Sequence, residues 1–238
     1  MTNILILGAS SQIGHELALR FSSNAVLTLV GRNQEKLQRV ARQCAEAGAK
    51  HVSCIVQDLA AGVEPLLQQL GDVPLDLVMN LIAATSRIGD GEFLLSNLES
   101  YVRSDVLVPV QLLQKLVERS CTPLKVIFIS SILAAAKSPD RLLYGSLKLL
   151  QEMCLQKLSM GHHGCELLIV KVGIVVPHES SSRTAHQLAE AVYTAHRQKK
   201  HVLTYGWMGR VYLALFYAQP MLFRWVVKLQ RMFRHSTS

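Results

Sequence analysis

Asn-Ile-Leu-Ile-Leu-Gly-Ala-Ser-Ser-Gln-Ile-Gly, at residues 3–14, is the stretch that decides the fold of this chain. The apolar run at residues 4–7 suits a central parallel strand that is buried on both faces. Gly8 turns the chain, and from Ile13 the apolar residues follow helical spacing, so Gly14 falls in the first helical turn. This order predicts a phosphate-binding loop, although plain packing of a helix on a strand produces the same pattern.

Small residues at a helix start indicate how this loop would hold a dinucleotide. The first turn of a helix leaves N–H groups without partners at the positive end of the helix dipole, and small side chains let a pyrophosphate approach them. We therefore expect cofactor contacts from Gly8, Ser10, Ser11, Gln12 and Ile13.

Arg32 follows the second expected strand, at residues 25–30, and bears on the choice of cofactor. Folds that prefer NAD usually place an acidic residue near this point to bind the ribose 2′-hydroxyl. Residues 30–32 include no acid, whereas a guanidinium suits a 2′-phosphate through charge-assisted hydrogen bonds. The sequence thus favours NADP over NAD, with a merely solvated arginine as the alternative. Asn33 is expected to cap the helix that follows.

The next two strands lead to polar residues at their carboxyl ends, where open α/β sheets bind ligands. A strand at 51–56 leads to Asp58 and Leu59, and Asp58 either contacts an adenine edge or caps the next turn. A strand at 75–82 carries Asn80 near its end. All three residues are candidate cofactor contacts.

A fifth strand, at residues 124–131, delivers the hydroxyl of Ser131 to the same edge of the sheet. Tyr144 and Lys148 follow at positions i and i+4 of a helix and therefore share one face of it. An ammonium near the phenol oxygen favours the phenolate, so we expect Lys148 to lower the pKa of Tyr144. Ser131 can hold a carbonyl oxygen, and these three residues are the candidate catalytic set.

The remaining elements complete an alternating pattern of strands and helices. We expect further cofactor contacts from Gly173 and Val175, which lie in the sixth strand. The expected elements are a long helical region at 94–119 containing Asp105, the sixth strand at 166–176, a polar loop at 178–183, a helix at 185–196 and a short strand at 201–204.

Composition limits the class of protein. A chain of 238 residues with 50% hydrophobic and 18% charged residues suits a single globular domain without long disorder. Five cysteines without a C-x-x-C pair suggest neither a disulfide framework nor a metal site, which fits a cytoplasmic protein. We expect no secretory signal, because the chain opens directly into a strand without a basic and then apolar leader pattern. We expect no transmembrane segment, because no apolar run approaches about 20 residues.

The basic character of the chain is confined to its C-terminal part. Of 25 lysines and arginines, eight lie in residues 191–238, which contain no acidic residue. Residues 207–238 combine an apolar face with a basic one, which is typical of a helix lying at a membrane surface. A helix packed on its own domain or on a second subunit is the alternative. Nucleic acid is not an expected partner, because no aromatic and basic recognition motif is present.

Together these residues resemble the short-chain dehydrogenase/reductase family over about residues 3–205. The resemblance rests on the segment at 8–14, Asn80, Ser131, and Tyr144 with Lys148. It implies that the tyrosine protonates a carbonyl oxygen, that the lysine lowers the tyrosine pKa and binds the nicotinamide ribose, and that the serine orients the substrate. It also implies an association into homodimers or homotetramers.

Four features depart from the family pattern. Gln12 replaces a glycine, Leu-Ile at residues 81–82 replaces Ala-Gly, and Val172 stands where a proline usually precedes the glycine. Asp105 replaces a helix asparagine that holds a relay water in the family, and we include it in the candidate catalytic set. The tail is similar to that of family members that reduce lipid-linked keto-sugars.

The sequence thus predicts a Rossmann-like, doubly wound α/β domain at residues 1–206 with a helical extension at 207–238. The expected activity is NADP-dependent reduction of a bulky carbonyl substrate, or oxidation of the alcohol, with a lipid-linked or nucleotide-linked sugar as one possibility. The alternative is a non-catalytic NADP-binding sensor or scaffold. The expected location is the cytoplasm, with peripheral contact to the inner face of the membrane.

Overall fold

A computed structural model describes residues 1–83, 97–136, 141–161, 164–173, 181–206, 209–211 and 213–214. Its centre is a seven-stranded sheet in which every neighbouring pair of strands is parallel. The strand order is β3-β2-β1-β4-β5-β6-β7, the doubly wound order that the sequence predicts. The strands are β1 (Thr2–Leu7), β2 (Ala25–Gly31), β3 (His51–Val56), β4 (Leu77–Asn80), β5 (Leu124–Ser131), β6 (Cys165–Val172) and β7 (Val202–Tyr205).

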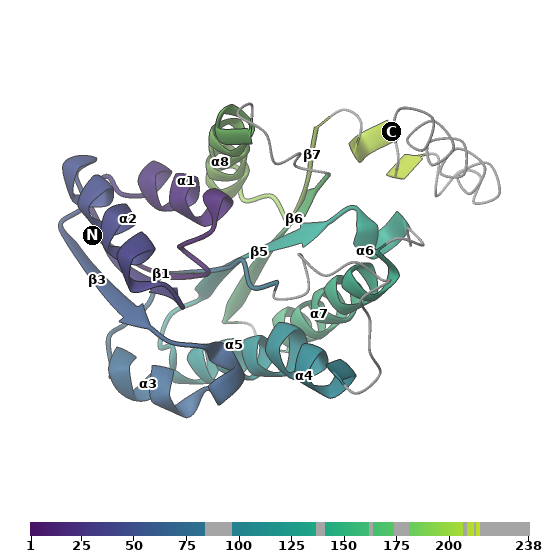
Figure 1. The fold of residues 1–238 in the computed structure, drawn as a ribbon, viewed down its shortest axis with the longest axis horizontal. Helices are drawn as coiled ribbons and strands as arrows, with labels where there is room; N and C mark the ends of the chain where they lie inside the picture. The colour runs from purple at the N-terminus through teal and green to yellow at the C-terminus, as the bar shows by residue number, and fades with distance from the viewer. Residues whose placement is uncertain are drawn as a thin grey trace.

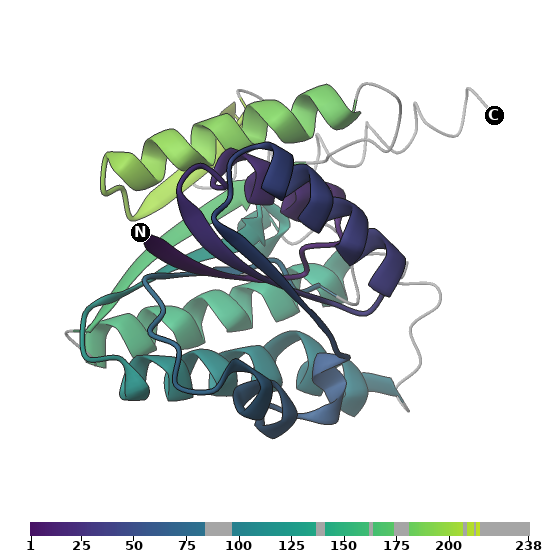
Figure 2. The same cartoon turned by 90° about the vertical axis from the view of Figure 1, so that its left-hand side faces the viewer.

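Helices cover both faces of the sheet (Figures 1 and 2). Helices α1, α2 and α8 lie on one face, and α3, α4, α5 and α7 lie on the other. The helices are α1 (Gln12–Arg20), α2 (Gln34–Glu46), α3 (Glu64–Leu70), α4 (Leu98–Val102), α5 (Val108–Arg119), α6 (Leu133–Ala136), α7 (Leu142–Gly161) and α8 (Ser181–Arg197).

Strand β1 explains why the sheet needs two layers of helices. Ile4 and Ile6 belong to one hydrophobic core, and Leu5 and Leu7 to the other, because successive side chains of a strand point to opposite faces. All four are at most 2% exposed. A strand without a polar face can sit only in the middle of a sheet that is covered on both sides.

Side-chain caps fix two helix starts that the sequence predicts. Ser11 accepts a hydrogen bond from the backbone N–H of Gly14 at 3.0 Å and so caps α1. Asn33 accepts one from the N–H of Lys36 at 2.8 Å, which confirms it as the cap of α2. Helix α1 therefore begins at Gln12 after a short turn, and α2 begins at Gln34, after the two residues that follow the end of β2.

Some elements end earlier or begin earlier than expected. Strand β4 covers Leu77–Asn80 rather than 75–82, because the Asn80 side chain accepts the Ile82 N–H at 3.1 Å and removes it from strand pairing. Strand β6 ends at Val172, and residues 181–183, expected in a polar loop, begin helix α8. A serine-rich sequence also suits a helix start, where side-chain oxygens are preferred.

The helical region before β5 contains one wide turn. A π-helical turn, Arg103–Leu107, joins α4 to α5, and its closing bond runs from the Val108 N–H to the Arg103 carbonyl. Pro109 accounts for this turn, because a proline has no N–H to donate four residues back and its ring would clash with the carbonyl of Asp105.

The described helices include none that is both long and apolar enough to cross a membrane. Of the expected extension at 207–238, only residues 209–211 and 213–214 are described, and they are helical. Gly209 is buried, and a Cβ added there would lie 3.4 Å from Ile132, the residue after Ser131. The start of the extension therefore packs beside the carboxyl end of β5.

Candidate functional site

The turn after β1 is built for close packing at the carboxyl edge of the sheet. Gly8 has a φ of +85°, which favours glycine, and the N–H groups of Gly8 and Ala9 both donate to the Val30 carbonyl. A Cβ on Gly14 would lie only 2.5 Å from the Gly8 carbonyl oxygen. The start of α1 is thus pressed against the turn.

Residues expected to hold the adenosine end of a dinucleotide gather beside this turn. A Cβ on Gly31 would lie 3.0 Å from the Ser10 hydroxyl, so Ser10 stands at the end of β2. The Arg32 guanidinium lies 3.9 Å from the Asp58 carboxylate, and both side chains are more than half exposed. The structure therefore brings Ser10, Arg32 and Asp58 to one corner of the sheet.

Ser131 and Tyr144 meet at the end of β5. Their side chains form a hydrogen bond, and the Ser131 oxygen also accepts the N–H of Leu133 at 3.2 Å. Ser131 is 6% exposed and Tyr144 is partly buried. Helix α7 is held close to this strand end, because a Cβ on Gly145 would run into the Leu133 carbonyl.

Lys148 lies deeper in the same site and is only 4% exposed. Its ammonium donates to the carbonyl oxygens of Ile82 and Ile129, each at 2.9 Å, and lies 4.6 Å from the centroid of the Phe128 ring. Burial lowers the pKa of Lys148 to about 8, against the opposing effect of the nearby carboxylates Asp105 and Glu152.

Asp105 is 4% exposed and faces both members of the tyrosine and lysine pair. Its carboxylate accepts a hydrogen bond from the Ser104 hydroxyl at 3.2 Å and raises the pKa of both Tyr144 and Lys148. The wide turn before Pro109 places this carboxylate in the site.

The segment after β4 joins the two halves of the site. Leu81 donates its N–H to Leu7, and a Cβ on Gly8 would lie 3.4 Å from the Leu81 side chain. The following residue, Ile82, accepts the Lys148 ammonium. Leu81 contacts the glycine turn and Ile82 binds Lys148, so two consecutive residues connect the two parts of the site.

The expected lowering of the Tyr144 pKa is corrected by the structure. Burial raises the pKa of the phenol, the hydrogen bond with Ser131 lowers it, Asp105 raises it and Arg141 lowers it, with the net change upward. The Lys148 ammonium donates its hydrogen bonds to two backbone carbonyls rather than to the phenol. The phenol is thus kept in its protonated form at neutral pH.

The family profile described as short chain dehydrogenase matches residues 2–192, well over half of the chain. The chain belongs to this family. Its members are NAD(P)-dependent oxidoreductases, and the seven-stranded sheet described above has the family fold.

Similar proteins agree with this assignment. A "Hydroxysteroid 11-beta-dehydrogenase 1-like protein" of Xenopus tropicalis is 36% identical over 99 residues, which cover 38% of this chain and 34% of that protein. A short-chain dehydrogenase of Sphingobium yanoikuyae in complex with NADPH has a TM-score of 0.76 at 20% identity, covering 93% of this chain and 95% of that one. A bulky-bulky ketone specific alcohol dehydrogenase of Comamonas testosteroni has a TM-score of 0.76 at 19% identity, covering 93% of both chains.

The residues present fit the nicotinamide dinucleotide of this family. Gln12, the departure in the glycine turn, is the first residue of α1 and is exposed, so it does not fill the turn. Asn80 is fully buried, and its Nδ2 has no hydrogen-bond partner among the described residues. A donor left in this way at the strand end is available to a bound group.

Other expected contacts are placed less directly. Ile13 is partly buried against one core, and the Leu59 side chain is 5% exposed in the other, so Leu59 can offer only its backbone. A Cβ on Gly173 would lie 3.9 Å from Ile132, which puts Gly173 beside the end of β5. Val175 lies outside the described residues.

Sequence reasoning missed a second buried carboxylate. Glu152 is 3% exposed on α7 and accepts a hydrogen bond from Ser130 at 2.5 Å. Its other oxygen lies 3.1 Å from the Lys171 ammonium. Two signals were available: Glu152 stands four residues after Lys148, and Lys171 interrupts an apolar run at residues 167–172.

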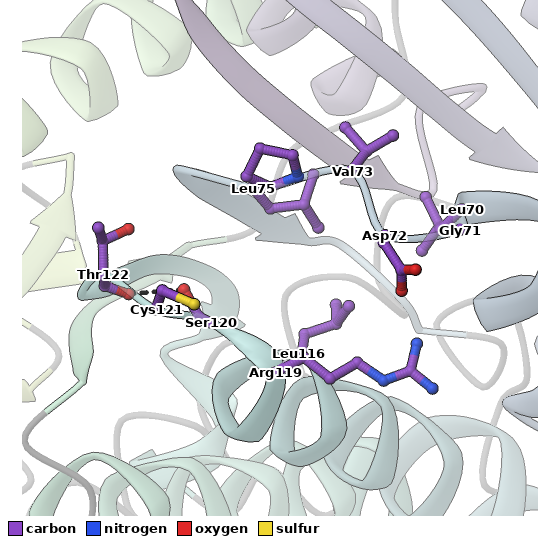
Figure 3. Close-up of a pocket in the computed structure, with 11 residues that line it drawn as sticks. Leu70, Gly71, Asp72, Val73, Leu75, Leu116, Arg119, Ser120, Cys121 and Thr122 are labelled. Carbon is purple, nitrogen blue, oxygen red and sulfur yellow. Dashed lines mark hydrogen bonds between the residues drawn. The ribbon is translucent and has the colours of Figure 1, made fainter.

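A cavity of about 220 Å³ lies away from this site (Figure 3). It is lined by residues 70–75, Leu116 and residues 119–122, which precede β4 and β5 and so mark the amino edge of the sheet. Ligands bind this class of sheet at the carboxyl edge. The cavity therefore contributes nothing to the site at Tyr144.

Proposed function

We propose that this protein is an NADP-dependent carbonyl reductase or alcohol dehydrogenase, with Ser131, Tyr144, Lys148 and Asp105 as its catalytic set. The observation that carries the proposal is the meeting of a serine hydroxyl, a protonated phenol and a buried ammonium at the carboxyl end of β5. A bound nicotinamide supplies the hydride. The side chains of the protein then have to hold the carbonyl and provide the proton.

Tyr144 acts as the general acid in the direction of reduction. Its raised pKa keeps the proton on the phenol at neutral pH until a carbonyl oxygen that gains negative charge accepts it. Ser131 holds that oxygen and afterwards donates a hydrogen bond to the phenolate. A proton donor of this kind contributes roughly 100- to 10,000-fold to a rate.

Lys148 supplies a positive charge and Asp105 a negative charge close to Tyr144. Two of the three ammonium hydrogens of Lys148 are used by carbonyl oxygens of the described residues, which leaves one for a ribose hydroxyl. Asp105 stands where a carboxylate can hold a water and return a proton toward Tyr144. We therefore assign Asp105 to the proton route.

NADP is the proposed cofactor rather than NAD. The exposed Arg32 guanidinium stands at the end of β2 with the Ser10 hydroxyl close by. Its weak pairing with Asp58, at 3.9 Å, leaves the guanidinium free to turn toward a 2′-phosphate. Cofactor contacts from the turn at residues 8–14 and from Asn80 complete this part of the proposal.

The proposed substrate is a bulky ketone or alcohol, with a lipid-linked or nucleotide-linked sugar as one candidate class. The buried Gly209 begins the amphipathic extension next to Ile132, so a membrane-bound tail would bring the site close to a lipid surface. We propose a cytoplasmic enzyme that contacts the inner face of the membrane through residues 207–238.

A homodimer or homotetramer is the proposed assembly. Helix α7 presents large apolar side chains to solvent, with exposed fractions of 41% for Leu150, 58% for Met153 and 80% for Met160. Such residues on one helix are typical of a surface that another subunit covers.

The deciding experiment replaces Tyr144 with Phe and measures NADPH oxidation across ketones that include nucleotide-linked keto-sugars. We expect turnover to fall by about 100-fold or more, while NADPH binding, followed by fluorescence, is retained. Tyr193→Phe is the matched control, because that ring packs on Phe21 far along the chain on α8. Near-normal turnover in Tyr144→Phe would refute the role, and tight NADPH binding without turnover in the wild type would favour a sensor.

A further inference from the structure

Between α7 and the sheet lies a group of polar and charged side chains that the reaction proposed above does not use. Glu152 on α7, Lys171 on β6 and Ser130 on β5 come from three elements and meet on one face of the sheet. Ser130 and Lys171 are paired across the two parallel strands, so their side chains point to the same side. This side is the one that α7 covers.

Glu152 is held from both of its oxygens. Oε1 accepts the Ser130 hydroxyl and Oε2 lies 3.1 Å from the Lys171 ammonium. The exposed fractions of the Glu152 and Lys171 side chains are only 4% and 16%. A carboxylate fixed in this way has a defined position, because a charge removed from water needs such partners.

The spacing along α7 places the Glu152 carboxylate on the same face of the helix as the catalytic Lys148. Lys148 and Glu152 are four residues apart, one above the other on the buried face of the helix. Lys148 also lies over the Phe128 ring, and Phe128 stands two residues before Ser130 on the same face of β5. The Glu152 carboxylate opposes the lowering of the Lys148 pKa that burial causes.

The other elements packed on α7 supply two further charges to this cluster. The π-helical turn supplies Asp105, and β6 supplies Lys171, whose ammonium is already paired with Glu152. Among the described residues the cluster therefore contains two lysines and two carboxylates. Removal of Glu152 alone would leave one carboxylate for two ammonium groups.

We propose that Glu152 is a positioning residue for the reaction: anchored by Ser130 and Lys171, its carboxylate lies one helical turn beyond Lys148 and maintains the charge and placement of that ammonium. The inference rests on the proposed function, since it assigns Glu152 to the same proton-transfer site. It explains why a strand with apolar neighbours contains a lysine and why a buried helix face contains a glutamate.

The test compares pH profiles of Glu152→Gln and Lys171→Met, with NADPH and a reducible ketone. A loss of Glu152 lets burial lower the Lys148 pKa further, so the alkaline limb near pH 8 moves down by about one unit. Turnover at pH 8 then falls about fivefold while turnover at pH 6 changes little, because Lys148 stays charged there. Lys171→Met moves the limb the opposite way, since the Glu152 carboxylate then has no second ammonium and faces Lys148 alone.

A merely structural role predicts a different result. It lowers turnover in both variants at every pH and leaves the limb in place, and that outcome overturns the proposal. Glu166→Gln and Lys157→Met are matched controls, because these residues are exposed on β6 and α7 and should leave the profile unchanged. If Glu152→Gln does not fold, the double variant Glu152→Gln/Lys171→Met keeps the cluster neutral, and its limb must lie below that of Lys171→Met, because the Glu152 carboxylate is then absent.

A readout without turnover separates this inference from the proposed function. In protein labelled at lysine Cε, the Lys148 signal is the one missing from Lys148→Arg, and its titration is followed by NMR. Glu152→Gln should lower this midpoint by about one unit. An unchanged midpoint overturns the inference even in an active enzyme, whereas a shifted midpoint in a protein without turnover supports the electrostatic coupling and refutes the proposed activity.

Discussion

Gly14→Ala tests whether the turn after β1 depends on close backbone packing. The new methyl group would lie 2.5 Å from the Gly8 carbonyl oxygen and 2.9 Å from the Ala9 Cα. Real Cβ contacts stay above 3.0 Å, so α1 and the turn must separate by at least about half an ångström. Both neighbours are backbone atoms, and no side-chain rotation can relieve the clash.

The magnitude follows from two opposing effects. Overpacking of this kind costs about 1–3 kcal/mol, and the backbone contacts put Gly14→Ala at the upper end. Alanine recovers about 1 kcal/mol over glycine inside a helix. The net loss is about 2 kcal/mol, which corresponds to a fall in Tm of roughly 4–8 °C for a domain of this size.

Thermal unfolding and NADPH titration are the assays for this variant. A displaced turn no longer presents its N–H groups to a phosphate, so we expect NADPH affinity to fall by about tenfold, or about 1.4 kcal/mol. Gly161→Ala is the control, because nothing lies within 4 Å of a Cβ at the end of α7. Equal Tm and equal affinity in the two variants would refute the packing argument.

Two further predictions concern the ends of the cofactor and of the chain. Arg32→Ala should weaken NADPH binding by about 1.5–3 kcal/mol with little effect on NADH, since it removes a charge-assisted contact to the 2′-phosphate. Arg39→Ala, an exposed control on α2, should affect neither cofactor, and equal weakening of both by Arg32→Ala would contradict the assignment. Removal of residues 207–238 should reduce binding to anionic liposomes, measured by co-sedimentation. A full-length chain that ignores such liposomes would leave self-packing as the role of the extension.

The positions of the main elements could be read from the sequence because local signals were strong. The run at residues 4–7 has no polar face, and Asn33 and Ser131 stand at boundaries that turn chemistry and strand length define. The bounds of β3 and β5 are the expected ones. The expected strand at 75–82 ends early because the Ile82 N–H donates to the Asn80 side chain instead of to a neighbouring strand. The composition of the segment does not reveal such a hydrogen bond.

The electrostatics of the site could not be read in the same way. The spacing of Tyr144 and Lys148 is correct, yet burial of the phenol raises the tyrosine pKa, and the Lys148 ammonium is bound by the carbonyls of residues 82 and 129. Glu152 looks like a solvated charge in sequence, because only the fold shows which face of α7 is covered. The Tyr144 pKa and the exposure of Glu152 both depend on burial by residues that are far away in the sequence.

Pro109 has no functional group, yet it governs where an acidic group of the site stands. Each extra residue in a helix rotates everything before it by about 100° relative to everything after it. The wide turn at Arg103–Leu107 contains one extra residue per turn. Helix α5 therefore keeps its buried face, and Asp105 is buried in the turn. A chain with one residue fewer in this turn would keep the packing of α5 but would no longer place a carboxylate at the position of Asp105. The length of the turn therefore decides whether the site contains this negative charge.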